Sequence, residues 1–149
     1  MDHIDIEMLE ILQEDGRISV SDLSKKLNLS RPSVSERMMR LQEKGIIDHF
    51  SAVVSPEAVG RDTLLMIQVS ELKDTIPRFE KMIAEDTRVL ECHRVTGEVS
   101  YFIKAAVEGM DSLRELVDTL ISYGNINTSI VLKSPVERRK ILPEKREQE

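Results

Sequence analysis

At 149 residues, with 40% hydrophobic and 32% charged content and a net charge of −6, the chain can fill one ordinary domain or two small ones and is not coated in positive charge. No stretch approaches the roughly 18 uncharged apolar residues of a membrane span, and the first ten residues are acidic where a signal peptide is basic, so we expect a cytoplasmic protein without a membrane partner. The single cysteine, Cys92, excludes an internal disulfide, and without clustered metal ligands or a phosphate-binding glycine loop the sequence predicts no metal and no cofactor.

Two helices are predicted within residues 2–28. In the first, apolar side chains recur at helical spacing, and Asp15-Gly16 ends the pattern; these side chains are Ile4, Met8, Ile11 and Leu12. For the second, Ser19 or Ser21 can cap the start, and Asn28 suits a left-handed residue at the end.

A third helix follows a turn of about three residues. Ser30 can cap it, and Pro32 is tolerated in the first turn because its missing N–H has no intrahelical partner there. Its buried stripe consists of Val34, Met38 and Leu41, and Gly45 ends it. Two helices joined by so tight a turn form a helix-turn-helix, whose second helix enters the major groove of DNA.

The segment 45–60 contains β-forming residues and a Ser-Pro turn, which predicts a wing or a strand that leads away from the helices. Pro56 and Gly60 then mark a domain boundary. We therefore expect a winged helix-turn-helix DNA-binding domain over 1–50, a linker over 51–62, and a ligand-sensing and oligomerisation domain over 63–149.

In the second domain the pattern predicts a strand, a helix, two strands joined at Gly97, a helix and a closing strand; their ranges are 63–70, 75–86, 88–97, 100–108, 110–124 and 126–134. The order βαββαβ is that of a ferredoxin-like domain, with four antiparallel strands and two helices on one face. The fold class is thus α+β. The uncovered face should be apolar and need a partner, through residues such as Leu65, Ile67, Cys92, Phe102 and Ile103 or their neighbours.

Positive charge in the first fifty residues gathers around the third helix. Residues 24–44 hold six basic and two acidic side chains, whereas residues 1–22 hold one basic and seven acidic ones. Because arginine can bind guanine or phosphate, and serine either a base edge or a phosphate, we expect Ser33, Ser35 and Arg37 at bases. The remaining candidates for DNA binding hold the backbone or lie beside it: Ser21, Lys25, Lys26, Arg31, Pro32 and Arg40.

Any amphipathic surface helix can carry arginines, and that is the simpler alternative. The tight turn, the serine cap followed by an early proline, and the scarcity of acidic residues together favour DNA binding.

The chain resembles the Lrp/AsnC family of bacterial and archaeal transcription regulators. The resemblance lies in "IDIEMLEILQEDGRISVSDLSKKLNLSRPSVSERMMRLQEKGIID" (4–48), in "VLECHRVTGEVSYFIKAAVEGMDSLRELV" (89–117) and in "INTSIVL" (126–132). It implies a winged helix-turn-helix joined to a ligand-sensing βαββαβ domain, assembly of homodimers into octamers or similar rings, and a response to amino acids. Twofold symmetry of the dimer implies palindromic half-sites in double-stranded DNA.

The resemblance also implies an effector site near the loop between the second and third strands. The common family pattern there is Gly-Asp-x-Asp-Tyr, and this chain reads Gly97-Glu98-Val99-Ser100-Tyr101. Ser100 replaces the second acid, which would suit pairing with the ammonium of an amino acid. Asn125 and Thr128 are further effector candidates, and the alternative is that this stretch is simply a hairpin turn.

Cys92 and His93 are neighbours in a predicted strand and therefore point to opposite faces, so they cannot readily form a nucleophile–base pair. We expect no catalytic residue and no enzyme. The main hypothesis is a sequence-specific, amino-acid-responsive regulator. One alternative is an architectural, chromatin-like DNA binder; a remote one is a tetrapyrrole decarboxylase of similar fold, for which His93 and Arg94 are present.

Overall fold

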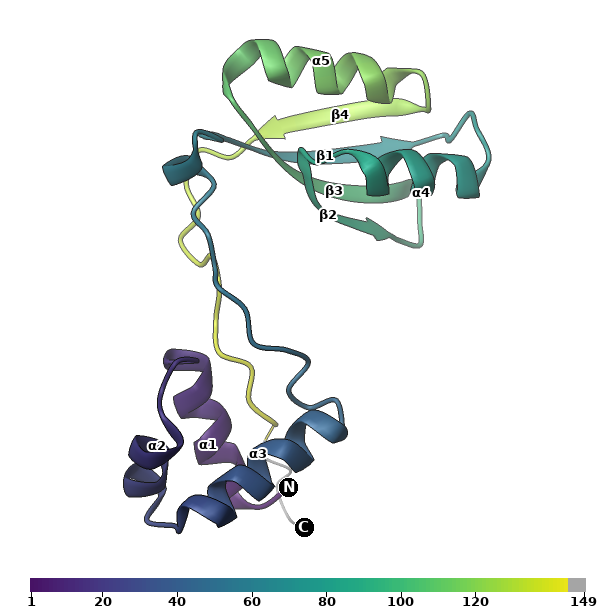
Figure 1. The fold of residues 1–149 in the computed structure, drawn as a ribbon. Coiled ribbons are helices and arrows are strands. Elements are labelled where there is room, and N and C mark those ends of the chain that lie inside the picture. Colours follow the sequence, from purple (N-terminus) through teal and green to yellow (C-terminus); the bar gives the residue numbers. More distant parts are fainter. Residues whose placement is uncertain (145–149) are drawn as a thin grey trace. The chain divides into compact units, whose positions relative to one another are not determined.

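The computed structural model describes residues 1–144, which form two compact units (Figure 1). The helical unit comprises residues 1–53 together with the described segment 136–144, and the sheet unit comprises Val54–Pro135. The sequence placed everything after residue 63 in one domain, whereas the described chain from Val136 groups with the helices; the expected domain end at 149 lies outside the described residues. The reason is local: the Gln13 side chain hydrogen-bonds both backbone groups of Ile141, each at 2.9 Å.

Three helices build the helical unit: α1 (His3–Glu14), α2 (Val20–Leu27) and α3 (Arg31–Glu43). A capping box starts α1, since the Asp5 backbone N–H donates to Asp2 Oδ1 at 2.9 Å and the Asp2 N–H donates to Asp5 Oδ2 at 3.2 Å. Ser19 caps α2, and Asn28 ends it in the left-handed region at φ 52°, as the sequence predicted. Ser30 caps α3, with Pro32 in its first turn. Each such cap typically stabilises by about 1 kcal/mol.

The core of this unit is aliphatic, and it contains Met8, Leu9, Leu12, Leu23, Leu27, Val34, Leu41 and Ile47. The predicted wing strand is wrong: among the described residues 45–62, none forms a strand, and only a 3-10 turn (Glu57–Val59) is regular. Val53 and Val54 are 69% and 62% exposed. Although their side chains favour a strand, neither residue pairs with a neighbouring strand.

The sheet unit confirms the predicted order βαββαβ. Its strands are β1 (Thr63–Ser70), β2 (Val89–Arg94), β3 (Val99–Val107) and β4 (Asn125–Ile130), and its helices are α4 (Ile76–Glu85) and α5 (Gly109–Ile121). The strands are antiparallel in the order β2-β3-β1-β4. Phe79 and Ile83 of α4 and Leu116 and Leu120 of α5 pack into one core with the inward side chains of the strands. None of the helices in residues 1–144 has the length and apolar character to cross a membrane.

The two faces of the sheet carry different residues from those expected. Four of the five side chains assigned to the uncovered face instead point into the core beneath the helices: Leu65, Ile67, Cys92 and Ile103. Only Phe102 lies on the uncovered face, where Met66 joins it; they are 43% and 49% exposed. Because side chains alternate along a strand, Phe102 and Ile103 cannot share a face.

Candidate DNA-binding surface and small-molecule groove

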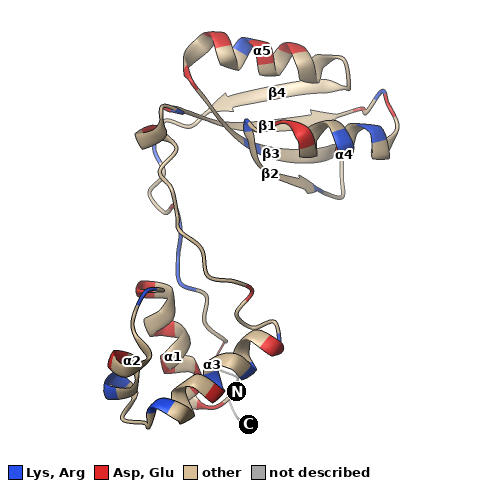
Figure 2. Ribbon diagram, in the orientation of Figure 1, with Lys and Arg blue, Asp and Glu red and all other residues tan. Residues whose placement is uncertain are grey.

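The outer face of α3 is a ridge of Arg31, Ser35 and Met39, which follow one another at a spacing of four residues and are all exposed. Figure 2 shows Lys and Arg, in blue, on α2 and α3. Met39 is 55% exposed, and the sequence analysis missed it. Extending the four-residue spacing from Arg31 through Ser35 would have found it. A methionine at this position can make apolar contact with a thymine methyl group.

The predicted contacts on α2 differ in their surroundings. Lys26 is exposed and has no ion pair within residues 1–144, whereas Lys25 pairs with Asp22 at 3.2 Å. Ser21 is half-buried, and its carbonyl accepts a hydrogen bond from the Ser24 hydroxyl. Lys26 is therefore the freer cation of the two for a phosphate.

In the first turn of α3, Pro32 is exposed, while Ser33 is half-buried. The Ser33 hydroxyl lies 2.9 Å from that of Ser30, the N-cap. Ser33 is thus partly engaged in capping its own helix, and Ser35 is the more accessible serine.

Arg37 and Arg40 lie against α1. Arg37 Nη1 donates to Asp5 Oδ1 at 2.6 Å and to Asp2 Oδ2 at 2.8 Å, and its side chain is only 21% exposed. Arg40 Nη2 lies 3.4 Å from Asp5 Oδ1. We call these four residues the α1–α3 brace. To contact a base, as the sequence predicted, Arg37 would have to break its ion pairs with Asp2 and Asp5.

Charge and hydrogen bonding explain the ionisation of the brace. The Asp5 backbone N–H and then the Arg37 guanidinium lower the pKa of Asp2 to about 2. Burial by itself raises the pKa of Asp5, but the hydrogen bonds from Arg37 and from the Asp2 N–H outweigh it, and the net pKa is lowered. Both acids are therefore charged at neutral pH, as is Arg37, whose pKa is raised by Asp2 and Asp5.

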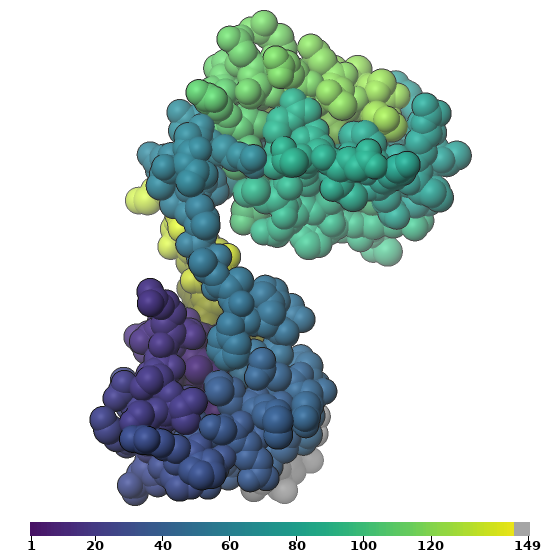
Figure 3. All heavy atoms as spheres, viewed as in Figure 1, coloured from purple at the N-terminus to yellow at the C-terminus, as the bar shows by residue number. Residues whose placement is uncertain are grey.

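A second feature of the helical unit is the segment 136–144, whose yellow atoms lie beside purple α1 in Figure 3. Besides the paired Gln13–Ile141 hydrogen bonds, Lys140 Nζ lies 3.2 Å from Glu14 Oε2. A wide hollow lies between this segment, the second half of α1 and the chain after Ile46, and its apolar lining includes Leu9, Leu12, Phe50 and Leu142.

Most of the predicted effector residues gather at one end of the sheet. Ser70, the last residue of β1, pairs with Val99 on one side and with Asn125 on the other. The turn before Val99 contains Gly97, at φ 110°, a conformation that favours glycine, and the exposed Glu98. The Ser100 carbonyl closes the turn by accepting a hydrogen bond from the Val95 N–H at 3.0 Å.

Three predicted effector side chains already have defined surroundings. Asn125 Nδ2 donates to Glu71 Oε2 at 2.7 Å. Thr128 pairs with Ile67 in register, and its hydroxyl is buried without a hydrogen-bond partner within residues 1–144. Tyr101 is 2% exposed and points beneath α4, so it is separated by the sheet from a ligand on the uncovered face.

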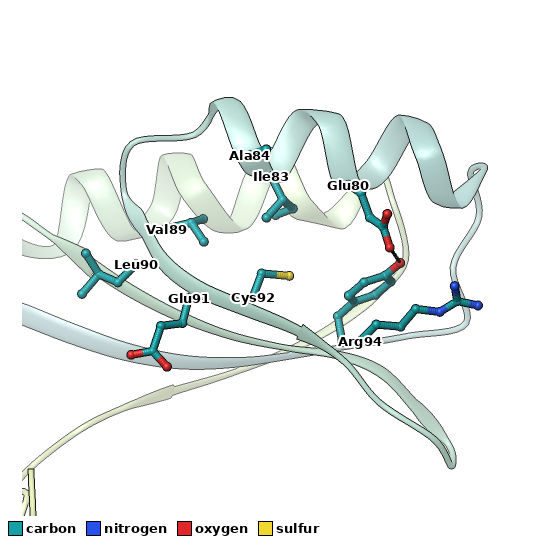
Figure 4. Close-up of a pocket in the computed structure, with 9 residues that line it drawn as sticks. Glu80, Ile83, Ala84, Val89, Leu90, Glu91, Cys92 and Arg94 are labelled. Atoms are coloured by element: carbon teal, nitrogen blue, oxygen red, sulfur yellow. Dashed lines mark hydrogen bonds between the residues drawn. The ribbon is translucent and has the colours of Figure 1, made fainter. Parts of the chain in front are cut away.

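Tyr101 instead lines a groove of about 350 Å³ between α4 and the edge strand β2 (Figure 4). The groove is lined by Glu80, Ile83, Ala84, Val89, Leu90, Glu91, Cys92, Arg94 and Tyr101. Its volume lies within the roughly 300–1,000 Å³ typical of small-molecule sites. The sequence analysis missed Glu80, because only the packing of α4 over β2 brings it opposite Tyr101.

One end of the groove is formed by Glu80, Tyr101 and Arg94. There the Tyr101 hydroxyl donates to Glu80 Oε1 at 2.8 Å, and Arg94 lies beside this pair. Burial and then Glu80 raise the pKa of Tyr101 to about 12, so the phenol stays protonated and keeps donating. Burial and then Glu80 also raise the pKa of Cys92, which makes its thiol an apolar wall rather than a nucleophile.

The strand β2 separates its neighbouring side chains as expected. Cys92 pairs in register with buried Ile103, and His93 pairs with exposed Phe102, so the two point to opposite faces. His93 Nε2 lies 3.3 Å from Glu91 Oε2 on the uncovered face, whereas Arg94 lines the groove. The pair needed for the tetrapyrrole decarboxylase alternative is thus divided between the two faces. No cluster of three potential metal ligands occurs among the described residues.

Two protein families match the chain. Residues 1–48 match winged helix-turn-helix DNA-binding domains, and residues 63–141 match the Lrp/AsnC ligand binding domain. The two matches leave out only the segment around the boundary between the two units and the last residues.

Similar proteins cover most of the chain. The proline dehydrogenase transcriptional activator of Rhizobium radiobacter is 34% identical over 145 residues, which are 92% of each chain. The leucine-responsive regulatory protein of Escherichia coli K12 is 31% identical over 131 residues, 85% of this chain and 80% of that protein.

Solved structures agree. Bacillus subtilis LrpC has a TM-score of 0.87 at 25% identity, over 93% of this chain and 99% of that one. A transcriptional regulator of Neisseria meningitidis in complex with L-Met has a TM-score of 0.87 at 31% identity, over 95% and 96% of the two chains.

Proposed function

Because the chain belongs to the Lrp/AsnC family of transcriptional regulators, we propose that it binds specific DNA sites as an oligomer and changes its binding in response to an amino acid or a related small metabolite. The observation that carries the proposal is the exposed ridge of Arg31, Ser35 and Met39 on the second helix of a helix-turn-helix, in the same chain as a grooved βαββαβ unit. A DNA-binding regulator of this kind acts in the cytoplasm. The proposal contains no catalytic step, in line with relatives that are named regulators.

We assign the DNA contacts by accessibility. Ser35 and Met39 suit base edges, and Lys26 suits a phosphate. Arg31 can serve either purpose, since the planar guanidinium can donate two hydrogen bonds to a guanine or to a phosphate. Arg37 and Arg40 are assigned to the α1–α3 brace, and Ser21, Lys25, Pro32 and Ser33 to the margin of the interface.

Two observations support the response to a metabolite. The Neisseria neighbour is a complex with L-Met, and the Escherichia coli relative is named leucine-responsive. In this chain we place the effector at the end of the sheet that holds Gly97, Glu98, Ser100 and Asn125, together with the adjoining groove under Tyr101. Thr128 lies further along β4 and is a candidate through its unpartnered hydroxyl.

Homodimerisation is supported by the uncovered face of the sheet. Met66 and Phe102 are about half-exposed there, and a sheet with helices on one side only needs a cover for such side chains. A homodimer that pairs these faces, and then assembles into an octamer, would present two α3 helices to half-sites about one DNA turn, roughly 34 Å, or a multiple of it apart.

The proposal is tested by measuring binding of the full-length protein to DNA upstream of its own gene and to random DNA of equal length. The titrations cover a salt series, with and without a mixture of L-amino acids. Specific regulators prefer their sites by about 10³-fold or more, so a large preference that shifts with amino acids is expected. Equal and steeply salt-dependent binding to both DNAs would instead identify an architectural binder.

Two variants separate base reading from phosphate binding. Ser35→Ala should weaken binding to the specific site by about 1–3 kcal/mol and leave random DNA unaffected. Lys26→Gln should weaken binding to both DNAs and reduce the salt slope by about 1. Lys81→Gln, in the sheet unit, is the matched control and should change neither. Equal losses from Ser35→Ala on both DNAs would contradict base reading.

A further inference from the structure

Half of the basic side chains around α3 are already paired with carboxylates. Residues 24–44 hold six of them, and Lys25, Arg37 and Arg40 form ion pairs. The other three are exposed and form no ion pair within residues 1–144: Lys26, Arg31 and Lys44. Residues 1–53 as a whole carry seven basic and ten acidic side chains. Because binding to random DNA is almost entirely electrostatic, it depends on the few cations that stay unpaired.

The ion pairs differ in how easily a phosphate can replace the carboxylate. Lys25 and Asp22 are both exposed, and such a surface pair contributes little. In the α1–α3 brace, by contrast, Asp5 is buried and Arg37 is largely covered. Arg37 Nη1 donates to both carboxylates, at 2.6 and 2.8 Å, so a phosphate would have to replace two charged hydrogen bonds. The brace therefore keeps its arginines where the surface pair does not keep Lys25.

Arg37 lies on the flank of α3 away from the ridge. It follows Ser35 by two residues, which is a rotation of about 200° around the helix. A helix in the major groove lies between two phosphate backbones, so an unpaired arginine on this flank can bind a phosphate while the ridge faces the bases. That contact carries no sequence information.

We propose that Asp2 and Asp5 determine specificity by withholding Arg37 and Arg40 from DNA phosphates, so that the protein binds random DNA weakly and depends on the base contacts of the ridge. The inference rests on the proposed function, and it deepens it by naming residues that set its selectivity. The charges of the brace balance, two carboxylates against two guanidinium groups. If one carboxylate is removed, one guanidinium is left unpaired for a phosphate.

An additional phosphate contact favours random DNA over the specific site. At the specific site the base contacts fix the position of α3, whereas on random DNA the protein can settle wherever the extra cation meets a phosphate. The brace thus acts on selectivity without touching a base.

The test variant is Asp2→Asn, because asparagine caps a helix about as well as aspartate and Asp2 is exposed. The full-length protein is titrated with random DNA and with DNA upstream of its own gene across a salt series, and thermal melting verifies the fold. At physiological salt the variant should bind random DNA about three- to fivefold more tightly, with a salt slope steeper by about 1. Its preference for the upstream DNA should fall.

Two controls separate the released arginine from a change in net charge. Asp2→Asn/Arg37→Gln leaves one carboxylate, Asp5, against one guanidinium, Arg40, and should return the affinity for random DNA and the salt slope to those of the unmodified protein. Glu7→Gln removes an exposed carboxylate of α1 that forms no ion pair among the described residues. It changes the net charge as Asp2→Asn does, and it should change neither the affinity nor the slope.

A purely structural role of Asp2 predicts the opposite sign, since a loosened α3 would bind both DNAs more weakly. Weaker or unchanged binding of Asp2→Asn to random DNA would overturn the inference, as would an equal gain in Glu7→Gln; the selectivity of the unmodified protein, and with it the proposed function, would stand. An unmodified protein that does not prefer the upstream DNA would contradict the proposed function and this inference together.

Discussion

The Asp5 carboxylate, 5% exposed, joins α1 to two arginines of α3, the helix that carries the ridge of Arg31, Ser35 and Met39. Asp2 is the N-cap of α1 and Asp5 lies in its first turn, where the partial positive charge of the helix N-terminus favours anions. The same carboxylates thus accept hydrogen bonds from the backbone N–H groups at the start of α1 and, through the arginines, fix the rotation of α3 about its axis. That rotation decides which side chains form the ridge.

We predict that Asp5→Asn lowers the free energy of unfolding at pH 7 by about 1–2 kcal/mol. This is less than a fully buried charged hydrogen bond would contribute, because the two arginines are partly exposed to solvent. The pKa of Asp5 is lowered in the folded protein, so its contribution is present above the unfolded value of about 3.9 and is lost as the pH falls below it. Denaturant unfolding should show a gap between the two proteins that is constant from about pH 7 to 5 and closes below about pH 4.

The matched control is Glu10→Gln, an exposed carboxylate of the same helix without an ion pair among the described residues. It should change stability little at any pH. A gap for Asp5→Asn that is as large at pH 3 as at pH 7 would show that the carboxylate charge is not what stabilises the brace.

Sequence reasoning at the residue scale found the arginines but not their partners. Arg37 and Asp5 are 32 positions apart in the sequence. The residue spacing within α3 places Arg37 outside the buried stripe, and a residue that contacts DNA would be placed there as well. Only the crossing of α1 over α3 distinguishes the two. Met39 was missed for a different reason, because an apolar residue next to a buried stripe is ordinarily assigned to the core.

The helices and strands were predictable because their signals are local. The caps Ser19 and Ser30 and the left-handed Asn28 each act within a few residues, and the αββαβ pattern after β1 follows from apolar spacing. The prediction of a wing strand was wrong because strand pairing depends on segments distant in the sequence. A β-forming segment without a neighbouring strand remains unpaired. Side chains were assigned to the wrong face of the sheet because, in an apolar run such as Phe102-Ile103, the sequence does not show which residue points toward the helices.

At the scale of the sheet, we predict that Phe102→Glu prevents dimerisation. The substitution places a charge in the middle of the uncovered face, where the partner would have to bury it. Since Phe102 is already 43% exposed, the monomer should remain folded. Sedimentation velocity should show a dimer or a larger assembly for the unmodified protein and a monomer for the variant.

Ile121→Glu is the control, because Ile121 is 52% exposed on α5 and not on the uncovered face. It should sediment as the unmodified protein does. If Phe102→Glu retains the same assembly, the interface lies elsewhere.

For the whole molecule, the chain passes between its two units twice, after Val53 and again before Val136. The sequence analysis expected one crossing, since a charged tail carries no signal for a docking site 128 positions away. What holds the segment is the Gln13 side chain, which donates to the Ile141 carbonyl and accepts from its N–H.

We predict that Gln13→Ala speeds hydrogen exchange at the Ile141 amide, because its acceptor is removed. Gln13→Glu keeps an acceptor for this amide and should retain most of the protection. Exchange measured residue by residue by NMR distinguishes the two, with Gln42→Ala, an exposed glutamine on α3, as the control. Equal exchange in Gln13→Ala and the unmodified protein would mean that the segment is held by other contacts.

The return of the chain at Val136 also bears on the order of events during synthesis. A ribosome adds about 5–20 residues per second and releases the chain from its N-terminus, so the three helices emerge first and the βαββαβ unit next. The segment that completes the helical unit emerges only afterwards. The DNA-binding half of the protein is consequently begun first and finished last, and a nascent chain can present its α3 ridge before Ile141 exists to bind Gln13.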